Sequence, residues 1–361
     1  MSEARVAAAM RNRLADEKTP IIRNAWYVAA ISHELQPGEI LARRIAGVGV
    51  ALYRTADGTA VALKDRCPHR AFPLSDSRLE GDDIVCGYHG FRYGPSGRCV
   101  HVPSASEPPK GIRARSYPIV EQAPLVWIWT GDPALAADTP LPSHPWMYED
   151  NGWARTPGYL TVACNYVHLH ENLLDLTHLS FLHAGTFGTP DYASAPFEVT
   201  ADGSDIRLYR RVAPTSLPPI YAKPLNLEGK PAARIVTSSY EAPGMQISAV
   251  VLQDLTQPEG ARTDHHIRTA QLLTPADQDS LHYFFLIGRD FACDDEATSR
   301  FIHGQIVAVF NEDKVALEKL TKVRREDMDE DVFDYSVPAD KAGVALRRHL
   351  RELAEKEADR Q

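Results

Sequence analysis

Two short Cys/His pairs near the N-terminus limit what the first part of this chain can fold into. Cys67 and His69 form one pair, Cys86 and His89 form the other, and sixteen residues separate them. Each pair lies beside a proline or a glycine, so each predicts a short loop, and two such loops can close on one metal centre from both sides. Thiolate and imidazole ligands suit iron or zinc.

Zinc is the main alternative for this site, because two cysteines and two histidines also form a tetrahedral structural centre. Zinc fingers usually pair cysteine with cysteine and histidine with histidine, whereas both pairs here are mixed. Mixed pairs are typical of a two-iron cluster in which one iron binds both thiolates and the other binds both imidazoles. We therefore predict a Rieske [2Fe–2S] cluster held by Cys67, His69, Cys86 and His89.

Residues 67–70 and 86–91 together resemble the Rieske motif of aromatic-ring and O-demethylating oxygenases. Residues 24–27 and 126–131 resemble the two ends of the Rieske domain in that family. The resemblance is strongest to the vanillate and dicamba demethylase branch and covers most of residues 20–325. It implies an α+β chain: an N-terminal all-β Rieske domain, then an α+β catalytic domain with a helix-grip-like antiparallel sheet covered by helices.

A second group of candidate ligands lies in a leucine-rich run. Asp175 and His178 are three positions apart and would share one face of a helix. His178 and His183 are five positions apart, which separates them by roughly 140° on a regular helix. For both to bind one metal the helix must end or distort between them, and Gly185 and Gly188 support an end there. Two histidines and a carboxylate on one iron leave open positions for oxygen and substrate.

The run from Asn172 to His183 also resembles the iron-binding motif of the same family. That resemblance implies His178 and His183 as ligands of a mononuclear non-haem Fe(II), with Asp313 as the third ligand and Glu312 as the fallback.

Two more residues receive roles from the resemblance. It implies that Asn172 lies near the iron without being a firm ligand. It also implies a head-to-tail homotrimer in which Asp175 links His89 of one subunit to His178 of the next. His168 and His170, just upstream, match no ligand position, and we interpret them as structural residues on a strand.

Length and composition set the wider limits. The 361 residues predict about two domains, and we expect an N-terminal segment at 1–20, the Rieske domain at 21–140 and the mononuclear iron catalytic domain at 141–361. The net charge of −9 argues against a nucleic-acid or anionic-membrane partner. We find no apolar run of signal-peptide or transmembrane length and therefore expect a cytoplasmic protein.

Short apolar or alternating runs predict strands, and longer amphipathic patterns predict helices. The expected strands are residues 26–30, 47–53, 59–63, 126–129, 247–252 and 281–287, and the apolar run 45–52 fits one buried strand. The expected helical segments are residues 171–182, 296–323 and 339–356.

The chain lacks a glycine-rich dinucleotide-binding motif after a strand. NAD(P)H therefore acts only indirectly, through a separate flavin-dependent reductase with or without a ferredoxin. Arginines crowd the Rieske region and offer a docking patch for such a partner, with scattered solvated charges as the alternative; they are Arg66, Arg70, Arg78, Arg92 and Arg98.

The resemblance implies that the chain hydroxylates an aromatic substrate with O2, most consistently as the O-demethylation of a methoxylated aromatic acid with release of formaldehyde. Hydroxylation, dioxygenation or N-demethylation of another aromatic compound is the alternative within the class. A Rieske electron carrier or redox sensor is the alternative outside it. Gln271 and Gly304 replace a histidine and an aromatic residue of some relatives, which leaves the substrate open.

Overall fold

The computed structural model describes residues 21–108, 110–149, 151–326 and 335–360, so the expectation for residues 1–20 lies outside the described residues. The chain divides into two compact units. One contains residues 21–142 together with 274–278, and the other contains residues 143–273 and the chain from 279 onward. Among the described residues, no helix is both long and apolar enough to cross a membrane.

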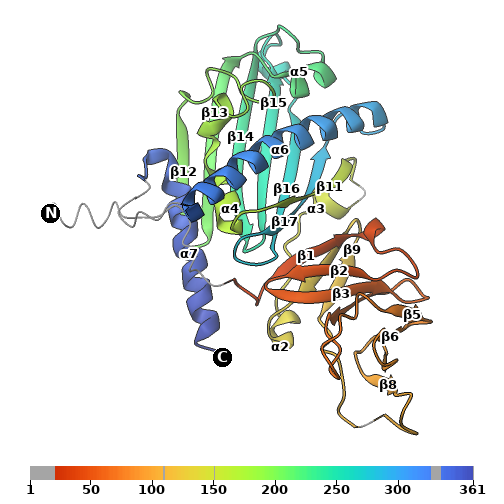
Figure 1. The fold of residues 1–361 in the computed structure, drawn as a ribbon. Coiled ribbons are helices and arrows are strands. Elements are labelled where there is room, and N and C mark those ends of the chain that lie inside the picture. Colours follow the sequence, from red (N-terminus) through yellow and green to blue (C-terminus); the bar gives the residue numbers. More distant parts are fainter. Residues whose placement is uncertain (1–20, 109, 150, 327–334, 361) are drawn as a thin grey trace, which may run out of the picture. The chain divides into compact units, whose positions relative to one another are not determined.

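The first unit is built almost entirely from short strands, as its alternating sequence predicts (Figure 1). They form three antiparallel sheets, ordered β1-β10-β9, β2-β3-β4 and β5-β6-β7-β8. The strands are β1 (Trp26–Ile31), β2 (Leu41–Ile45), β3 (Val48–Arg54), β4 (Ala60–Lys64), β5 (Arg78–Glu80), β6 (Asp83–Val85), β7 (Arg92–Tyr93), β8 (Cys99–His101), β9 (Ile119–Gln122) and β10 (Leu125–Trp129). Two short helices accompany them, η1 (Ser32–Glu34) and α2 (Pro133–Ala136).

The apolar run 45–52 is not one strand, and that expectation is wrong. Ile45 ends β2 and pairs with Val48 at the start of β3, so Ala46 and Gly47 form a two-residue turn. Both have positive φ, 47° and 79°, the conformation that a tight hairpin with right-twisted strands requires. A continuous apolar run hides such a turn because alanine lacks the usual turn signal of asparagine or aspartate.

The second unit is a seven-stranded antiparallel sheet ordered β11-β17-β16-β15-β14-β13-β12. Its strands are β11 (Ala154–Val162), β12 (Phe197–Asp202), β13 (Asp205–Thr215), β14 (Ala232–Ala242), β15 (Met245–Asp254), β16 (His265–Pro275) and β17 (Leu281–Arg289). Burial alternates along β13, with Ile206, Leu208, Arg210 and Val212 buried. This period of two turns one face of the sheet toward the interior of the unit.

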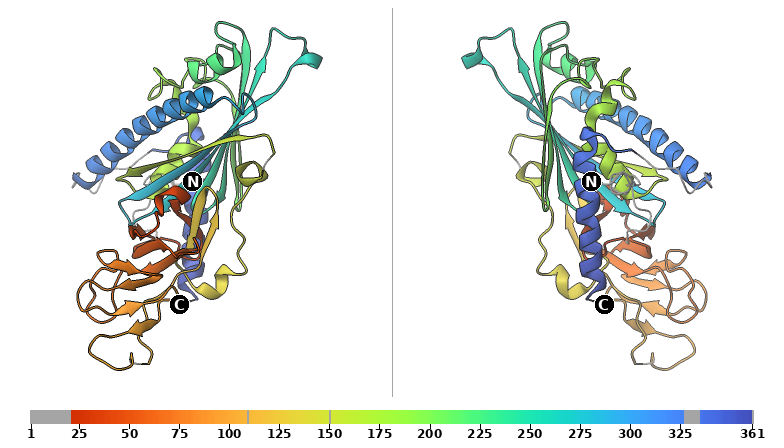
Figure 2. Two further views of the ribbon diagram at one scale, coloured as in Figure 1. Left: turned by 90° about the vertical axis from the view of Figure 1, so that its right-hand side faces the viewer. Right: turned by 90° about the vertical axis from the view of Figure 1, so that its left-hand side faces the viewer.

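Helices cover that sheet, which confirms the expected α+β architecture of the second unit. They are α3 (Pro145–Tyr148), α4 (Tyr166–Leu174), η2 (Leu176–Ser180), α5 (Pro219–Leu225), η3 (Glu259–Ala261), α6 (Glu296–Glu326), η4 (Pro338–Asp340) and α7 (Lys341–Ala358). The views in Figure 2 show the sheet nearly edge-on, with α6 across one face. The buried stripe of α6 includes Ile302, Ile306, Val309, Asp313 and Leu317, at helical spacing.

His168 and His170 lie on a helix, so the strand expected there is wrong. Helix α4 begins at Tyr166, because the Asn165 side chain accepts a hydrogen bond from Val167 N (2.9 Å) and caps its first turn. Both histidines are buried, with exposed fractions of 7% and 0%. Their alternation imitates the period of a strand, but the cap decides the conformation.

Candidate metal centres

The two Cys/His loops of the first unit have matching backbone hydrogen bonds. Cys67 N donates to Phe72 O and Cys86 N donates to Phe91 O, both at 2.8 Å. In each loop the residue four positions after the cysteine donates back to the cysteine carbonyl. Ala71 and Gly90 occupy those positions with φ of 60° and 71°. Each loop therefore reverses direction in the same way.

The loops bury their cysteines and expose their histidines. Cys67 and Cys86 are each 2% exposed, whereas His69 and His89 are exposed with ring centroids 4.7 Å apart. Sulfur on the inside and imidazole on the outside is the order that a Rieske cluster needs, because electrons leave on the histidine side.

Elementary electrostatics favours a bound cluster between these loops. Burial raises the pKa of Cys86, and the neighbouring Cys67 raises it further. Two buried thiols side by side resist ionisation unless a cation binds both. Tyr93 OH lies 3.2 Å from Cys67 Sγ and can donate to that sulfur once it is a thiolate. The donor set therefore fits a [2Fe–2S] cluster.

The expected basic patch beside this site is only partly free. Glu80 forms ion pairs with Arg78 (2.6 Å) and with Arg92. Arg66, Arg70 and Arg98 are exposed.

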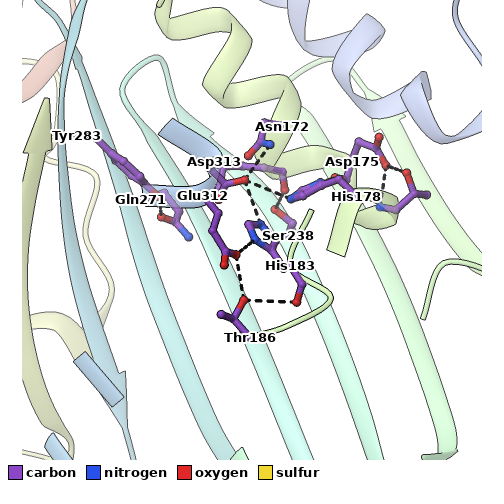
Figure 3. A network of polar contacts seen from close by, with 12 residues as sticks. Asn172, Asp175, His178, His183, Thr186, Ser238, Gln271, Tyr283, Glu312 and Asp313 are labelled. Carbon is purple, nitrogen blue, oxygen red and sulfur yellow. Dashed lines mark hydrogen bonds and ion pairs between the residues drawn. The ribbon is translucent and has the colours of Figure 1, made fainter. Parts of the chain in front are cut away.

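In the second unit the structure brings together His178, His183 and Asp313. One ligand atom from each lies within 4.8 Å of the others. His183 Nε2 is 3.1 Å and His178 Nε2 is 3.5 Å from Asp313 Oδ1. Figure 3 shows the three side chains pointing toward one another, with Asn172 beside Asp313.

The chain reaches this geometry by ending its helix early. α4 stops at Leu174, and Asp175 Oδ1 accepts from Thr177 N (2.9 Å) to begin η2. η2 ends at Ser180, and a turn then places His183 beside His178. The short helix η2 thus ends between the two histidines, whereas the α-helix expected over residues 171–182 already ends at Leu174, before both.

Hydrogen bonds outside the three residues orient the rings. His178 Nδ1 donates to the backbone carbonyl of Asp175 (2.5 Å), and His183 Nδ1 donates to Glu312 Oε2 (2.6 Å). Each ring therefore directs its Nε2 toward Asp313. Partners of this kind fix the tautomer and rotation of metal-binding histidines.

Glu312, the fallback ligand, has this supporting position in the structure. Besides His183, its Oε2 accepts from Thr186 Oγ1 (2.9 Å). Sequence reasoning did not identify Thr186, and the only available signal was its position three residues after His183.

The pKa values of the two histidines shift in opposite directions, although the same kinds of group act on both. Burial lowers the pKa of His178, and the nearby His183 adds to this while Asp313 opposes it. Burial also lowers the pKa of His183, but Asp313 and Glu312 outweigh it and produce a net rise. The two carboxylates therefore favour positive charge at His183.

Asn172 also indicates that the His178, His183 and Asp313 site can hold a metal ion. Its Nδ2 donates to Asp313 Oδ1 (3.1 Å), while its buried Oδ1 has no hydrogen-bond partner in the described part of the chain. A buried polar atom without a partner is costly, and this one lies beside the three candidate ligands. The residues present fit a mononuclear iron with two imidazoles and one carboxylate.

Asp175 is half-buried, and its carboxylate is occupied within its own segment. Oδ1 accepts from both the amide and the hydroxyl of Thr177, at 2.9 and 2.6 Å. The contact to His178 comes from the Asp175 backbone carbonyl. The link from its carboxylate to two histidines stays a prediction.

A cavity lies between the helices and the sheet, directly over the three candidate ligands. It contains about 660 Å3 of space not filled by atoms, including space open to solvent. Valine, isoleucine, leucine and phenylalanine from α4, β14–β16 and α6 supply most of its wall. Its polar lining residues include Gln271 and Arg234.

Gln271 is tied to neighbours by its own hydrogen bonds. Tyr283 OH donates to its Oε1, and its Nε2 donates to Ser248 Oγ (3.3 Å). Gly304 does not line the cavity and has open space where a side chain would begin. Arg234 was not expected from the sequence, since an arginine in an alternating strand usually faces solvent.

The all-β unit with paired Cys/His loops and the helix-covered sheet with its His/His/Asp group define a Rieske non-haem iron oxygenase. Residues 25–121 match the family model for the Rieske [2Fe-2S] domain, and residues 162–356 match the model for the vanillate O-demethylase oxygenase C-terminal domain. The chain belongs to the vanillate O-demethylase oxygenase family.

Curated relatives and a solved structure agree with this assignment. The iron-sulfur subunit of the toluene-4-sulfonate monooxygenase system of Comamonas testosteroni is 34% identical over 84% of this chain and 88% of its own. The oxygenase component of dicamba O-demethylase of Stenotrophomonas maltophilia is 33% identical over 93% and 99%. Dicamba monooxygenase bound to 3,6-dichlorosalicylic acid has a TM-score of 0.86 at 32% identity, over 93% and 98% of the two chains.

The chain is therefore the oxygenase component of a multi-component monooxygenase. Its cofactors are a Rieske [2Fe–2S] cluster and a mononuclear non-haem iron, and it receives electrons from a separate redox partner.

Proposed function

We propose that this oxygenase removes the methyl group of a methoxylated aromatic acid as formaldehyde. The observation that carries the proposal is the cavity over His178, His183 and Asp313, together with the similarity to dicamba O-demethylase along nearly the whole chain. The reaction consumes one O2, two electrons and two protons, and yields a phenol, formaldehyde and water.

We assign the cluster to Cys67, His69, Cys86 and His89, and the mononuclear iron to His178, His183 and Asp313. The pairing of buried thiols with exposed imidazoles supports the first assignment, and the convergence of three ligand atoms supports the second. When bound, the iron supplies the oxygen chemistry, with electrons that pass through the cluster.

The protein's own residues hold this site in shape. The Asp175 carbonyl and the Glu312 carboxylate hold His178 and His183 by their Nδ1 protons, and Asn172 holds Asp313. The apolar walls keep the substrate ring in place and restrict water around the reacting methyl group.

We further propose a head-to-tail homotrimer that works in the cytoplasm with a ferredoxin or flavin-dependent reductase. In this trimer the Asp175 carboxylate links His89 of one subunit to His178 of the next. The half-buried position of Asp175 and the exposure of His89 support this role. Five free cysteines suit a reducing compartment.

Asp175→Asn tests that link. We expect both metals to remain bound and the transfer of electrons from cluster to iron to become slower, because the carboxylate charge between the imidazoles is gone. Single-turnover kinetics of the reduced protein measures this rate, and metal analysis provides the control. An unchanged rate would refute the role of the carboxylate.

The reaction itself is tested by oxygen uptake with a reductase. The panel pairs each methoxybenzoate with the benzoate that lacks the methoxy group, and formaldehyde is measured beside O2. We expect stoichiometric formaldehyde only from the methoxylated acids. Oxygen uptake coupled to a hydroxylated product without formaldehyde would reject demethylation.

Hydroxylation of another aromatic acid is the second candidate. It is favoured by the similarity to the toluene-4-sulfonate monooxygenase subunit and by the different residues at Gln271 and Gly304. Adding a methyl-substituted aromatic acid to the same panel distinguishes hydroxylation from demethylation, because hydroxylation gives a hydroxylated product without formaldehyde.

A further inference from the structure

A buried arginine without an ion pair to any described carboxylate lines the substrate cavity. Arg234, on β14, is 1% exposed, and its Nε and Nη2 have no hydrogen-bond partner among the residues that the structure describes. Its Nη1 donates to the carbonyl of Phe187 (3.0 Å). Within the described part of the chain no carboxylate forms an ion pair with it.

Aromatic rings surround this guanidinium without neutralising it. Its Cζ lies 4.6 Å from the ring centre of Phe187, 4.7 Å from that of Tyr192 and 5.1 Å from that of Tyr221. Cation–π contacts contribute a modest amount, whereas burial of an unpaired charge costs several times more. The rings therefore hold the guanidinium in place, and the Tyr221 hydroxyl lies close enough to interact with it, but these neutral groups leave its charge uncompensated.

A second buried arginine, Arg210, serves as a comparison for Arg234. Arg210, on β13, is 0% exposed, and like Arg234 it stacks on Tyr192, at 4.9 Å. Arg210 does not line the cavity, and the carboxylate of Asp175 lies close enough to act on its charge. The Nε and Nη2 of Arg210 also have no hydrogen-bond partner among the described residues, so the two arginines differ in position: Arg234 lines the cavity, and Arg210 does not.

Gln271 carries no charge with which to neutralise an anionic group. Its Oε1 accepts from Tyr283, and one of its two Nε2 protons is donated to Ser248. Arg234 lines the same cavity as His178, His183 and Asp313, so one molecule in this cavity can contact both Arg234 and the candidate iron site.

We propose that Arg234 is the specificity-determining anchor of this oxygenase, and that it binds the carboxylate or sulfonate of an anionic aromatic substrate. The anion supplies the missing counter-charge and accepts from the free Nε and Nη2 donors, which form a fork suited to two oxygens. The ring then occupies the apolar part of the cavity. This inference rests on the proposed oxygenase function of the site but does not depend on demethylation.

The test is calorimetric binding to the oxidised holoenzyme without a reductase, so that no turnover occurs. The probes are 4-methoxybenzoate and its neutral amide, 4-methoxybenzamide, with benzoate and 4-toluenesulfonate as acids that lack a methoxy group. We expect the wild type to bind the acid more tightly than the amide by about tenfold or more. Arg234→Gln should remove that preference, and Arg234→Lys should retain part of it.

Arg210→Gln is the matched control, because it removes an equally buried arginine from the same face of the sheet without changing the cavity wall. It should retain the preference for acid over amide. Should Arg234→Gln fail to fold, the wild-type comparison and Arg234→Lys still decide the question.

The inference is overturned when the wild type binds acid and amide equally, binds none of the acids, or keeps its preference after Arg234→Gln. Its failure is distinguishable from failure of the proposed demethylation. Binding of acids that depends on Arg234, without any formaldehyde in turnover, would reject demethylation and support the anchor. Demethylation of neutral ethers with no preference for acids would support the demethylase function and reject the anchor role of Arg234.

Discussion

Asp313 is the one acidic residue in the buried stripe of a 31-residue helix. A carboxylate at such a position loses its hydration, and α6 tolerates it because three polar groups converge on the carboxylate: Asn172, His178 and His183. Its neighbour Glu312 is more exposed and contacts the far side of the His183 ring. Adjacent acids on one helix thus have different environments.

The different environments of Asp313 and Glu312 predict that substitutions of the two residues change the iron content differently. Asp313→Ala should abolish mononuclear iron while leaving the visible spectrum of the cluster unchanged. Glu312→Gln should keep the site but weaken its iron affinity by about 10–100-fold, as expected for a partner of a metal-bound histidine. Iron titration of the two variants measures this, and iron loss with Glu312→Gln but not with Asp313→Ala would reverse the assignment.

His170 predicts a dependence of stability on pH. Burial lowers its pKa to about 4, although its hydrogen bond to the carbonyl of Pro243 (2.9 Å) opposes the shift. The unfolded chain takes up the proton near pH 6.5, so the stabilisation is complete above that pH and is lost as the pH falls toward about 4. The loss amounts to as much as about 3 kcal/mol.

Denaturant unfolding at a series of pH values checks this expectation. His170→Gln keeps a donor for Pro243 and should have a shallower decline between pH 6.5 and 4.5 than the wild type. His33→Gln, at an exposed position, should follow the wild type. Parallel curves for all three proteins would contradict the role of His170.

At the scale of elements, the turn after η2 determines where His183 lies. The backbone amide of Gly188 donates to the His183 carbonyl (2.9 Å), and a Cβ at Gly188 would lie 1.7 Å from the carbonyl oxygen of Leu179. A side chain cannot fit there unless the backbone moves. Gly185, in the same turn, has open space at the corresponding point.

Gly188→Ala should therefore displace the turn, destabilise the protein by roughly 2 kcal/mol or more and reduce its mononuclear iron. Gly185→Ala is the matched control and should be close to neutral. Unfolding free energies and iron content distinguish the two variants. Equal tolerance of both substitutions would mean that Gly188 does not constrain the site.

At the scale of the whole molecule, the proposed trimer passes electrons between subunits, and complementation tests this directly. Cys86→Ala removes the cluster, and Asp313→Ala removes the mononuclear iron, so each variant should be inactive alone. In every mixed trimer one of the three subunit junctions joins an intact cluster to an intact iron, which should restore about a third of the activity.

Co-expression with two different affinity tags isolates the mixed assemblies for this measurement. Tandem purification also shows directly whether subunits associate. No recovered activity in confirmed mixed assemblies would mean that electrons stay within one chain.

The sequence by itself determined the chemistry of this protein, because metal ligands are recognisable from residue type and spacing. The paired Cys/His loops, the histidines at 178 and 183, and the class of fold follow from local pattern and family resemblance. Local pattern gave wrong predictions at two places. The apolar run 45–52 gave no signal of the turn at Ala46 and Gly47, and the alternation of His168 and His170 predicted a strand where the Asn165 cap begins a helix.

Only the tertiary structure decided which distant groups meet. The sequence could not place Glu312 behind His183 or give Thr186 a partner, because those contacts join segments more than a hundred residues apart. Nor could it show that Arg234 faces a cavity without a counter-charge, since burial and pairing are properties of the packed sheet and helices. Spacing along the chain identifies ligands, whereas packing determines which charges remain unpaired and therefore what the cavity can bind.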